Sequence, residues 1–298
     1  MGHIAFDYEQ LTQRIIDWAV QEPNVRAALE IGSRARTEHP ADRWSDLDVL
    51  LFVRDPERYA RSAAWVANLG SVCLTFVERT PDGGAWERRV LYAGGLDVDF
   101  ALNPAQWLDD MAANGVVPEM MDVIRRGVCV LADKDNLLAN ILQQPIPDVA
   151  PFHQPSSAEF AGAISDFWYH SLWSAKHLRR GELWWAKAAC DGKLKGLLQQ
   201  MLEWHAHAVQ GATHDTWMRG RFLEEWADPR AVAQLAKIFA HYDRQDIARA
   251  LRATMELFRW LAVETAERWK YAYPASGDQA VSEIVRQLLA EMNEADHS

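Results

Sequence analysis

The chain carries Leu29-Glu30-Ile31-Gly32-Ser33-Arg34-Ala35-Arg36 and, after a short gap, Trp44-Ser45-Asp46-Leu47-Asp48-Val49-Leu50-Leu51-Phe52. Side chains alternate along a strand, so Asp46 and Asp48, at the entry to an apolar strand, point to the same face. Neighbouring carboxylates repel each other unless a cation lies between them. Mg²⁺ prefers hard oxygen ligands of this kind, and the pair therefore predicts a magnesium site.

The Gly-Ser step before this strand predicts a phosphate-binding turn. Gly32 lets the backbone approach a phosphate closely, and Ser33 adds a hydroxyl and an amide at the expected start of a following helix. Arg34 or Arg36 is expected to neutralise the distal phosphates. A Gly-Ser step alone is a weak signal, but followed by Asp-x-Asp it joins a phosphate cradle to a metal site.

A second Asp-x-Asp pair lies in Gly95-Leu96-Asp97-Val98-Asp99-Phe100-Ala101-Leu102. Asp97 and Asp99 again share one face of a predicted strand. One of the two is expected to face the first pair and complete a triad that holds two metal ions and polarises an attacking hydroxyl. The spacing does not choose between them, and such pairs also occur where strands end in turns and where helices are capped.

The prolines at positions 145, 147, 151 and 155 predict a linker between a domain of residues 1–145 and a domain of residues 155–298. The first domain alternates helix and strand signals, with strands expected at residues 25–31, 47–53, 72–77, 89–92 and 96–102. The second shows helical periodicity and a capping box at Ser156 and Glu159. The predicted fold class is α+β, a mixed β-sheet flanked by helices and then an all-α helical bundle.

Composition narrows the classes of partner. The 298 residues include 31 Lys+Arg and 42 Asp+Glu, a net charge of −11, which argues against binding of nucleic acid. No apolar run is long enough to span a membrane and the first ten residues are acidic, so a cytoplasmic protein without a membrane partner is expected. The three cysteines, Cys73, Cys129 and Cys190, are far apart and are predicted to be reduced core residues.

With these residues in hand, the sequence resembles the aminoglycoside 6-adenylyltransferases, within the nucleotidyltransferase superfamily of the DNA polymerase β type. The resemblance covers nearly the whole chain. It runs through Gly32-Ser33-Arg34, Asp46-Leu47-Asp48, Val98-Asp99-Phe100-Ala101-Leu102-Asn103-Pro104, Val130-Leu131-Ala132-Asp133-Lys134-Asp135, Glu159-Phe160, Phe167-Trp168, Ala175-Lys176, Leu202-Glu203-Trp204 and Tyr271-Ala272-Tyr273-Pro274. The first two motifs identify only the superfamily, and the matches in the helical half narrow it to this group.

This resemblance implies a bacterial enzyme that transfers AMP from MgATP to a hydroxyl of an aminoglycoside, with the 6-hydroxyl of streptomycin as the expected acceptor and antibiotic resistance as the result. It implies that Asp46, Asp48 and Asp99 are catalytic and bind Mg²⁺. Nucleotide contacts are expected from Gly32, Ser33, Arg34 and, in the helical half, Lys176. Substrate contacts are expected from Asp97, Glu87 and Trp173.

Several points stay open at this stage. The carboxylate that takes the hydroxyl proton is one of Asp97, Asp99, Glu78 and Glu87. An alternative acceptor is a lincosamide or another small hydroxylated molecule. An alternative function outside the enzymes is that of a catalytically silent nucleotide-binding module. The expected oligomeric state is a monomer or a homodimer.

Overall fold

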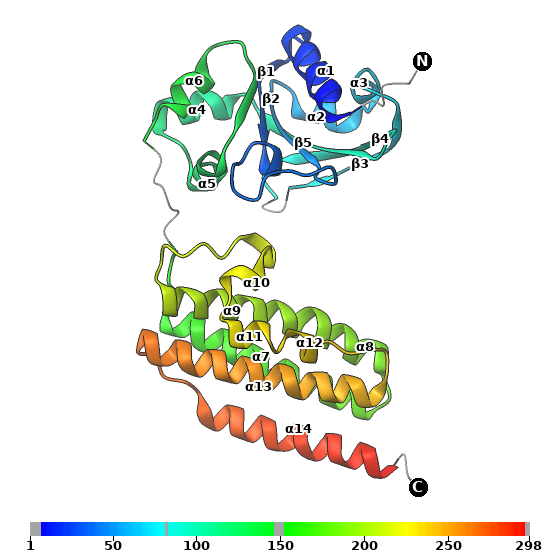
Figure 1. Cartoon of the computed structure of the whole chain (residues 1–298), viewed down its shortest axis with the longest axis vertical. Helices are drawn as coiled ribbons and strands as arrows, with labels where there is room; N and C mark the ends of the chain where they lie inside the picture. Colours follow the sequence, from blue (N-terminus) through cyan, green and yellow to red (C-terminus); the bar gives the residue numbers. More distant parts are fainter. Residues whose placement is uncertain (1–6, 81–82, 146–151, 296–298) are drawn as a thin grey trace. The chain divides into compact units, whose positions relative to one another are not determined.

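The computed structural model describes residues 7–80, 83–145 and 152–295. The chain divides into two compact units, Met1–Ala150 and Pro151–Ser298, and each is described here by itself (Figure 1). Most of the expected linker, residues 146–151, lies outside the described residues. Within those residues, no helix combines the length and the apolar character needed to cross a membrane.

The first unit is built on a six-stranded sheet with the strand order β3-β4-β5-β2-β1-β6. The strands are β1 (Val25–Ile31), β2 (Leu47–Val53), β3 (Val72–Arg79), β4 (Trp86–Tyr92), β5 (Leu96–Pro104) and β6 (Cys129–Asp133). Strands β2 and β5 are parallel and every other pair is antiparallel, so the sheet is mixed as expected. Strand β6 was not among the expected strands, and β4 begins three residues earlier than expected, because its first residues include Glu87 and Arg88.

Helices cover both faces of this sheet. On one face, α1 (Tyr8–Gln21), α2 (Pro56–Arg61) and α3 (Ala64–Ala67) pack on alternate residues of β2 such as Val49 and Leu51. On the other face, α4 (Gln106–Asn114) and α6 (Leu137–Leu142) pack on Phe52, and α5 (Pro118–Arg126) lies at the edge of the same cluster. Since side chains alternate along a strand, Asp48 and Asp99 belong to the face of α4.

Strand register brings the polar residues of this face side by side. Asp48 lies opposite Asp99 in the parallel pair and opposite Ile31 in the antiparallel pair. Arg89 of β4 lies opposite Asp99 on its other side. One row across four strands therefore reads Arg89, Asp99, Asp48 and Ile31, and it runs directly into the turn that carries Gly32.

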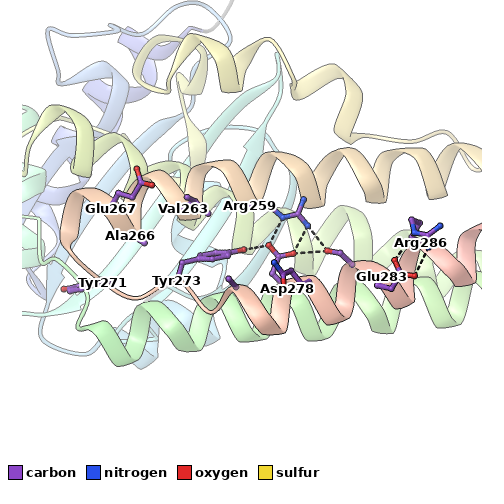
Figure 2. A pocket seen from close by; sticks show the side chains of 12 residues that line it. Arg259, Val263, Ala266, Glu267, Tyr271, Tyr273, Asp278, Glu283 and Arg286 are labelled. Atoms are coloured by element: carbon purple, nitrogen blue, oxygen red, sulfur yellow. Dashed lines mark hydrogen bonds and ion pairs between the residues drawn. The ribbon is translucent and has the colours of Figure 1, made fainter.

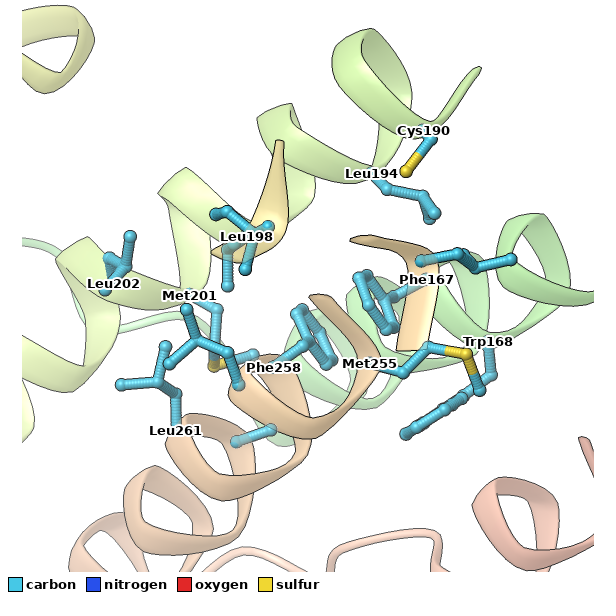
Figure 3. Packing of buried hydrophobic residues seen from close by; sticks show 14 of the residues in the cluster. Phe167, Trp168, Cys190, Leu194, Leu198, Met201, Leu202, Met255, Phe258 and Leu261 are labelled. Atoms are coloured by element: carbon cyan, nitrogen blue, oxygen red, sulfur yellow. The ribbon is translucent and has the colours of Figure 1, made fainter. Parts of the chain in front are cut away.

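The second unit is helical, as expected. Its long helices are α7 (Ser157–Arg179), α9 (Leu194–Gln210), α13 (Arg244–Trp269) and α14 (Ala275–Ala295), and its shorter elements are α8 (Leu183–Ala188), a π-helical turn (Ala189–Lys193), α10 (Leu223–Trp226), α11 (Pro229–Val232) and α12 (Leu235–Ile238). The predicted capping box of Ser156 and Glu159 opens α7. Figure 3 shows the core, where the rings of Phe167 and Phe258 stack with centroids 3.6 Å apart.

Two expectations about the first unit were wrong. Cys73 and Cys129 are exposed, and only Cys190 is a core residue, although all three are free thiols among the residues described. Cys73 and Cys129 lie on β3 and β6, the two edge strands of the sheet. In addition, the helix expected after Ser33 is a single 3-10 turn, Gly32–Arg34, so it contributes almost no helix dipole.

Helix α14 is held to α13 by a buried ion pair. Arg259 donates two hydrogen bonds of 2.6 Å to the carboxylate of Asp278, which also accepts hydrogen bonds from Tyr273 and Ser282 (Figure 2). Asp278 is only 4% exposed. Burial by itself raises its pKa, but these hydrogen bonds outweigh burial and lower it. The carboxylate is therefore charged and fully paired at neutral pH.

Replacing Asp278 by Asn is expected to lower the free energy of unfolding by about 2 kcal/mol, because the change leaves Arg259 buried on one side without its anion. A carboxylate with a lowered pKa stabilises the fold above about pH 4, and that contribution is lost as the pH falls through the native pKa. Urea unfolding at pH 7 and pH 3 measures both effects. The matched control is Glu283→Gln on the same helix, whose exposed pair with Arg286 is screened by solvent and contributes little to stability. Equal effects of the two changes at pH 7 would contradict this account.

Candidate active site

Three carboxylates converge at the end of the central strands. Asp46 lies in the loop before β2, Asp48 is on β2 and Asp99 is on β5, and one oxygen from each lies within 4.8 Å of the others. All three are partly buried. A divalent cation with oxygen ligands fits this donor set, because it would offset the repulsion among three anionic groups held this close.

The electrostatics of Asp99 reflect this crowding. Burial raises its pKa, and so do the carboxylates of Glu87 and of the two other aspartates, while the neighbouring guanidinium of Arg89 lowers it. The balance raises the pKa of Asp99 to about 7. A cation bound among the three carboxylates would favour the charged form, since an opposite charge nearby lowers a carboxyl pKa.

Arg89 is the residue of this site that the sequence analysis missed. Its guanidinium contacts Glu78 at 2.6 Å, Glu87 at 2.8 Å and Asp99 at 3.0 Å. Glu87 is 8% exposed, so its carboxylate is buried beside the Arg89 guanidinium. The alternation of Glu87 and Arg89 was visible in the sequence, but only the β4–β5 register reveals that Arg89 meets Asp99.

Gly32 is required by geometry at the turn. Its φ is +72°, a conformation that side chains with a Cβ rarely adopt, and an added Cβ would lie 2.1 Å from an Oδ2 oxygen of Asp48. The next residue, Ser33, has a buried Oγ that makes no hydrogen bond within the part of the chain described here. The turn thus leaves room for the Asp48 carboxylate and presents the Ser33 hydroxyl as a hydrogen-bond donor for a ligand.

Arg34 holds the loop that carries the first aspartate. Its guanidinium donates to the backbone oxygens of Asp46 at 2.9 Å and Ser45 at 2.7 Å. The same group lies 3.5 Å above the centre of the Tyr8 ring. These contacts make Arg34 a positioning residue for the loop, and its nucleotide contact stays a prediction.

Asp97 is exposed and lies outside the carboxylate triad, although it shares a strand face with Asp99. Its backbone N–H donates to the hydroxyl of Tyr8 at 3.1 Å. Of the two aspartates that spacing left open, Asp99 is therefore the one that joins Asp46 and Asp48. A substrate contact by Asp97 stays a prediction.

The two expected contacts from the helical unit both lie on α7. Lys176 is exposed, and the ring of Trp173 lies 3.8 Å from the ring of His177 and 5.7 Å from that of Trp185. The second unit is described by itself, so the expected roles of Lys176 and Trp173 toward nucleotide and substrate stay predictions.

A mixed sheet that presents three aspartates beside a Gly-Ser turn is the architecture of a nucleotidyltransferase. Comparison with known families gives the particular group: residues 7–288 match the model of the Streptomycin adenylyltransferase family, and the chain belongs to that family. It is therefore an enzyme of the nucleotidyltransferase class.

Individual relatives are distant but cover almost the whole chain. An aminoglycoside 6-adenylyltransferase of Bacillus subtilis (strain 168) is 23% identical over 274 residues, which are 89% of this chain and 92% of the relative. The enzyme of the same name from Staphylococcus aureus is 22% identical over 274 residues, 89% and 93% of the two chains. The crystal structure of an aminoglycoside 6-adenyltransferase from Bacillus subtilis aligns with a TM-score of 0.45 and 19% identity, covering 95% of this chain and 99% of that one.

Proposed function

We propose that this protein transfers AMP from MgATP to a hydroxyl of an aminoglycoside, and that the acceptor is the 6-hydroxyl of streptomycin. The observation that carries the proposal is the convergence of Asp46, Asp48 and Asp99 within 4.8 Å, beside a turn whose glycine leaves space for one of them. Membership of the Streptomycin adenylyltransferase family supports it. ATP as co-substrate places the reaction in the cytoplasm, and modification of the drug would make the host resistant.

In this proposal the domain of residues 1–145 performs the chemistry. Asp46, Asp48 and Asp99 would hold Mg²⁺, which when bound supplies charge stabilisation at the phosphate. Ser33 donates its buried hydroxyl to a nucleotide phosphate, which would provide the hydrogen-bond partner that the Oγ lacks in the described structure. Arg34 keeps the Asp46 loop in place.

The reaction itself is a displacement at the α-phosphorus of ATP. The acceptor oxygen forms a bond to phosphorus, the bond to the pyrophosphate oxygen breaks, and the hydroxyl proton passes to a carboxylate. Glu87 and Asp99 are the two proposed bases, since Asp99 belongs to the triad and Arg89 holds Glu87 beside it. The domain of residues 155–298 would add contacts from Lys176 to triphosphate and from Trp173 to the acceptor.

Incubation of the purified chain with ATP, Mg²⁺ and a panel of acceptors tests the proposal. Pyrophosphate release and mass spectrometry of the acceptor are the two measurements, and streptomycin is expected to gain one AMP while a lincosamide gains none. Transfer to the lincosamide alone would contradict the proposed acceptor but support the proposed transfer of AMP. Nucleotide binding without pyrophosphate release across a broad panel would instead indicate a silent nucleotide-binding module.

A further inference from the structure

A pocket of about 600 Å³ lies between the sheet and helices α4 and α5 of the first unit. Leu50 of β2 and Ala101 and Asn103 of β5 line it from the sheet. Trp107, Asp110 and Asn114 are among the residues that line it from α4. The volume is within the range of pockets that bind drug-sized molecules.

The floor of this pocket lies on the same sheet face as the carboxylate triad, farther along the strands. Ala101 and Asn103 follow Asp99 at alternate positions of β5, and Leu50 follows Asp48 in the same way on β2, so all of them share one sheet face. A strand rises about 3.3 Å per residue, which places the start of the pocket floor about 7 Å from Asp99. The gap between a molecule in the pocket and the triad would therefore be about the width of one sugar ring.

Strand order decides which substrate this side of the triad receives. The Gly32-Ser33 turn follows β1, whereas Ala101 and Asn103 lie on β5, on the other side of β2. In an in-line displacement the attacking oxygen and the leaving group lie on opposite sides of the phosphorus. Ser33 of the turn is proposed above to bind a nucleotide phosphate; if that phosphate belongs to the leaving pyrophosphate, the acceptor approaches from the side of β5 and β4.

Most of the described residues that line the pocket are apolar, and the polar ones favour a cationic ring over a nucleotide phosphate. No Lys or Arg occurs among the described residues that line the pocket, and Asp110 adds a negative charge. Trp107, Asp110 and Asn114 follow one face of α4, and Trp107 is 37% exposed. Aromatic faces attract cations, while a carboxylate and an amide bind amine and hydroxyl groups.

We propose that this pocket is an acceptor subsite that takes an amino- or guanidino-substituted ring, with the ring stacked on Trp107 and its cationic group bound by Asp110. The inference rests on the proposed aminoglycoside acceptor and adds the residues of the first unit that select it. The nucleotide does not enter this pocket.

Steady-state kinetics with streptomycin and ATP as the varied substrates test the subsite. Trp107→Ala is expected to raise the KM for streptomycin about tenfold and to leave the KM for ATP within about twofold, while Trp107→Phe recovers most of the loss. Asp110→Asn is expected to raise the KM for streptomycin about fivefold and to weaken its dependence on salt. The matched control is Asp109→Asn, an exposed neighbour on α4 that does not line the pocket.

Calorimetric titration of streptomycin into the same variants gives a readout that does not depend on turnover, and thermal unfolding checks that each variant is folded. A rise in the KM for ATP with an unchanged KM for streptomycin would overturn the inference and assign the pocket to the nucleotide. Unchanged binding of both substrates in folded Trp107→Ala and Asp110→Asn would also overturn it. If the wild-type chain modifies none of the aminoglycosides, the proposed function fails instead, and that result is seen before any variant is made.

Discussion

The variant Asp48→Asn is expected to lose AMP transfer by a factor of about 10³ or more while it keeps its fold. Asp48 lies at the centre of the triad, opposite Asp99 in the β2–β5 register, and its carboxylate occupies the space that Gly32 leaves open. Asn keeps the shape of the side chain and removes the charge that would hold the metal and stabilise the phosphate. Pyrophosphate release at saturating substrates measures the loss.

Two further measurements separate a lost metal site from a damaged fold. Removal of one of three crowded negative charges is expected to leave the free energy of unfolding unchanged or higher by up to about 1 kcal/mol. Binding of Mn²⁺, followed by electron paramagnetic resonance, is expected to weaken strongly in Asp48→Asn and to be unaffected by Asp109→Asn, an exposed charge of the same unit. Transfer at close to the wild-type rate in Asp48→Asn would refute the metal site.

Local pattern was sufficient to predict the first half of this site. The apolar residues from Val49 to Val53 follow two aspartates with strand spacing, Asp46 and Asp48, and the observed β2 has the expected bounds. The third carboxylate was different, because Asp97 and Asp99 have equivalent local patterns. Only the parallel pairing of β2 with β5, two strands far apart in the sequence, brings Asp99 rather than Asp97 to the triad.

Other parts of the site depended on contacts that no local pattern contains. The position of Arg89 among three carboxylates follows from the order β3-β4-β5, and β4 is too polar at its start for its full length to be predicted. The pocket beside Trp107 likewise needs α4 and the sheet in their folded positions. The exposure of Cys73 and Cys129 follows from edge positions in the same strand order.

The second large effect is expected at Gly32, where the sequence suggested a close approach to phosphate and the structure adds a close approach to Asp48. A methyl group in Gly32→Ala would lie 2.1 Å from the Oδ2 of Asp48, far inside contact distance, so the carboxylate must shift from its position in the triad. The positive φ of +72° adds strain of about 1 kcal/mol for a residue with a Cβ. We expect AMP transfer to fall at least about 10²-fold, since small displacements in a catalytic site have effects of this size.

Gly95→Ala separates the clash from the strain. Gly95 has a similar φ of +79°, yet an added Cβ there meets no atom within 4 Å. Both variants are expected to lose about 1 kcal/mol of stability in urea unfolding, because both force a Cβ into the left-handed region, but only Gly32→Ala should lose Mn²⁺ affinity and activity. If the two variants were equally active, Gly32 would serve backbone conformation alone, and its role in making room for the Asp48 carboxylate would be rejected.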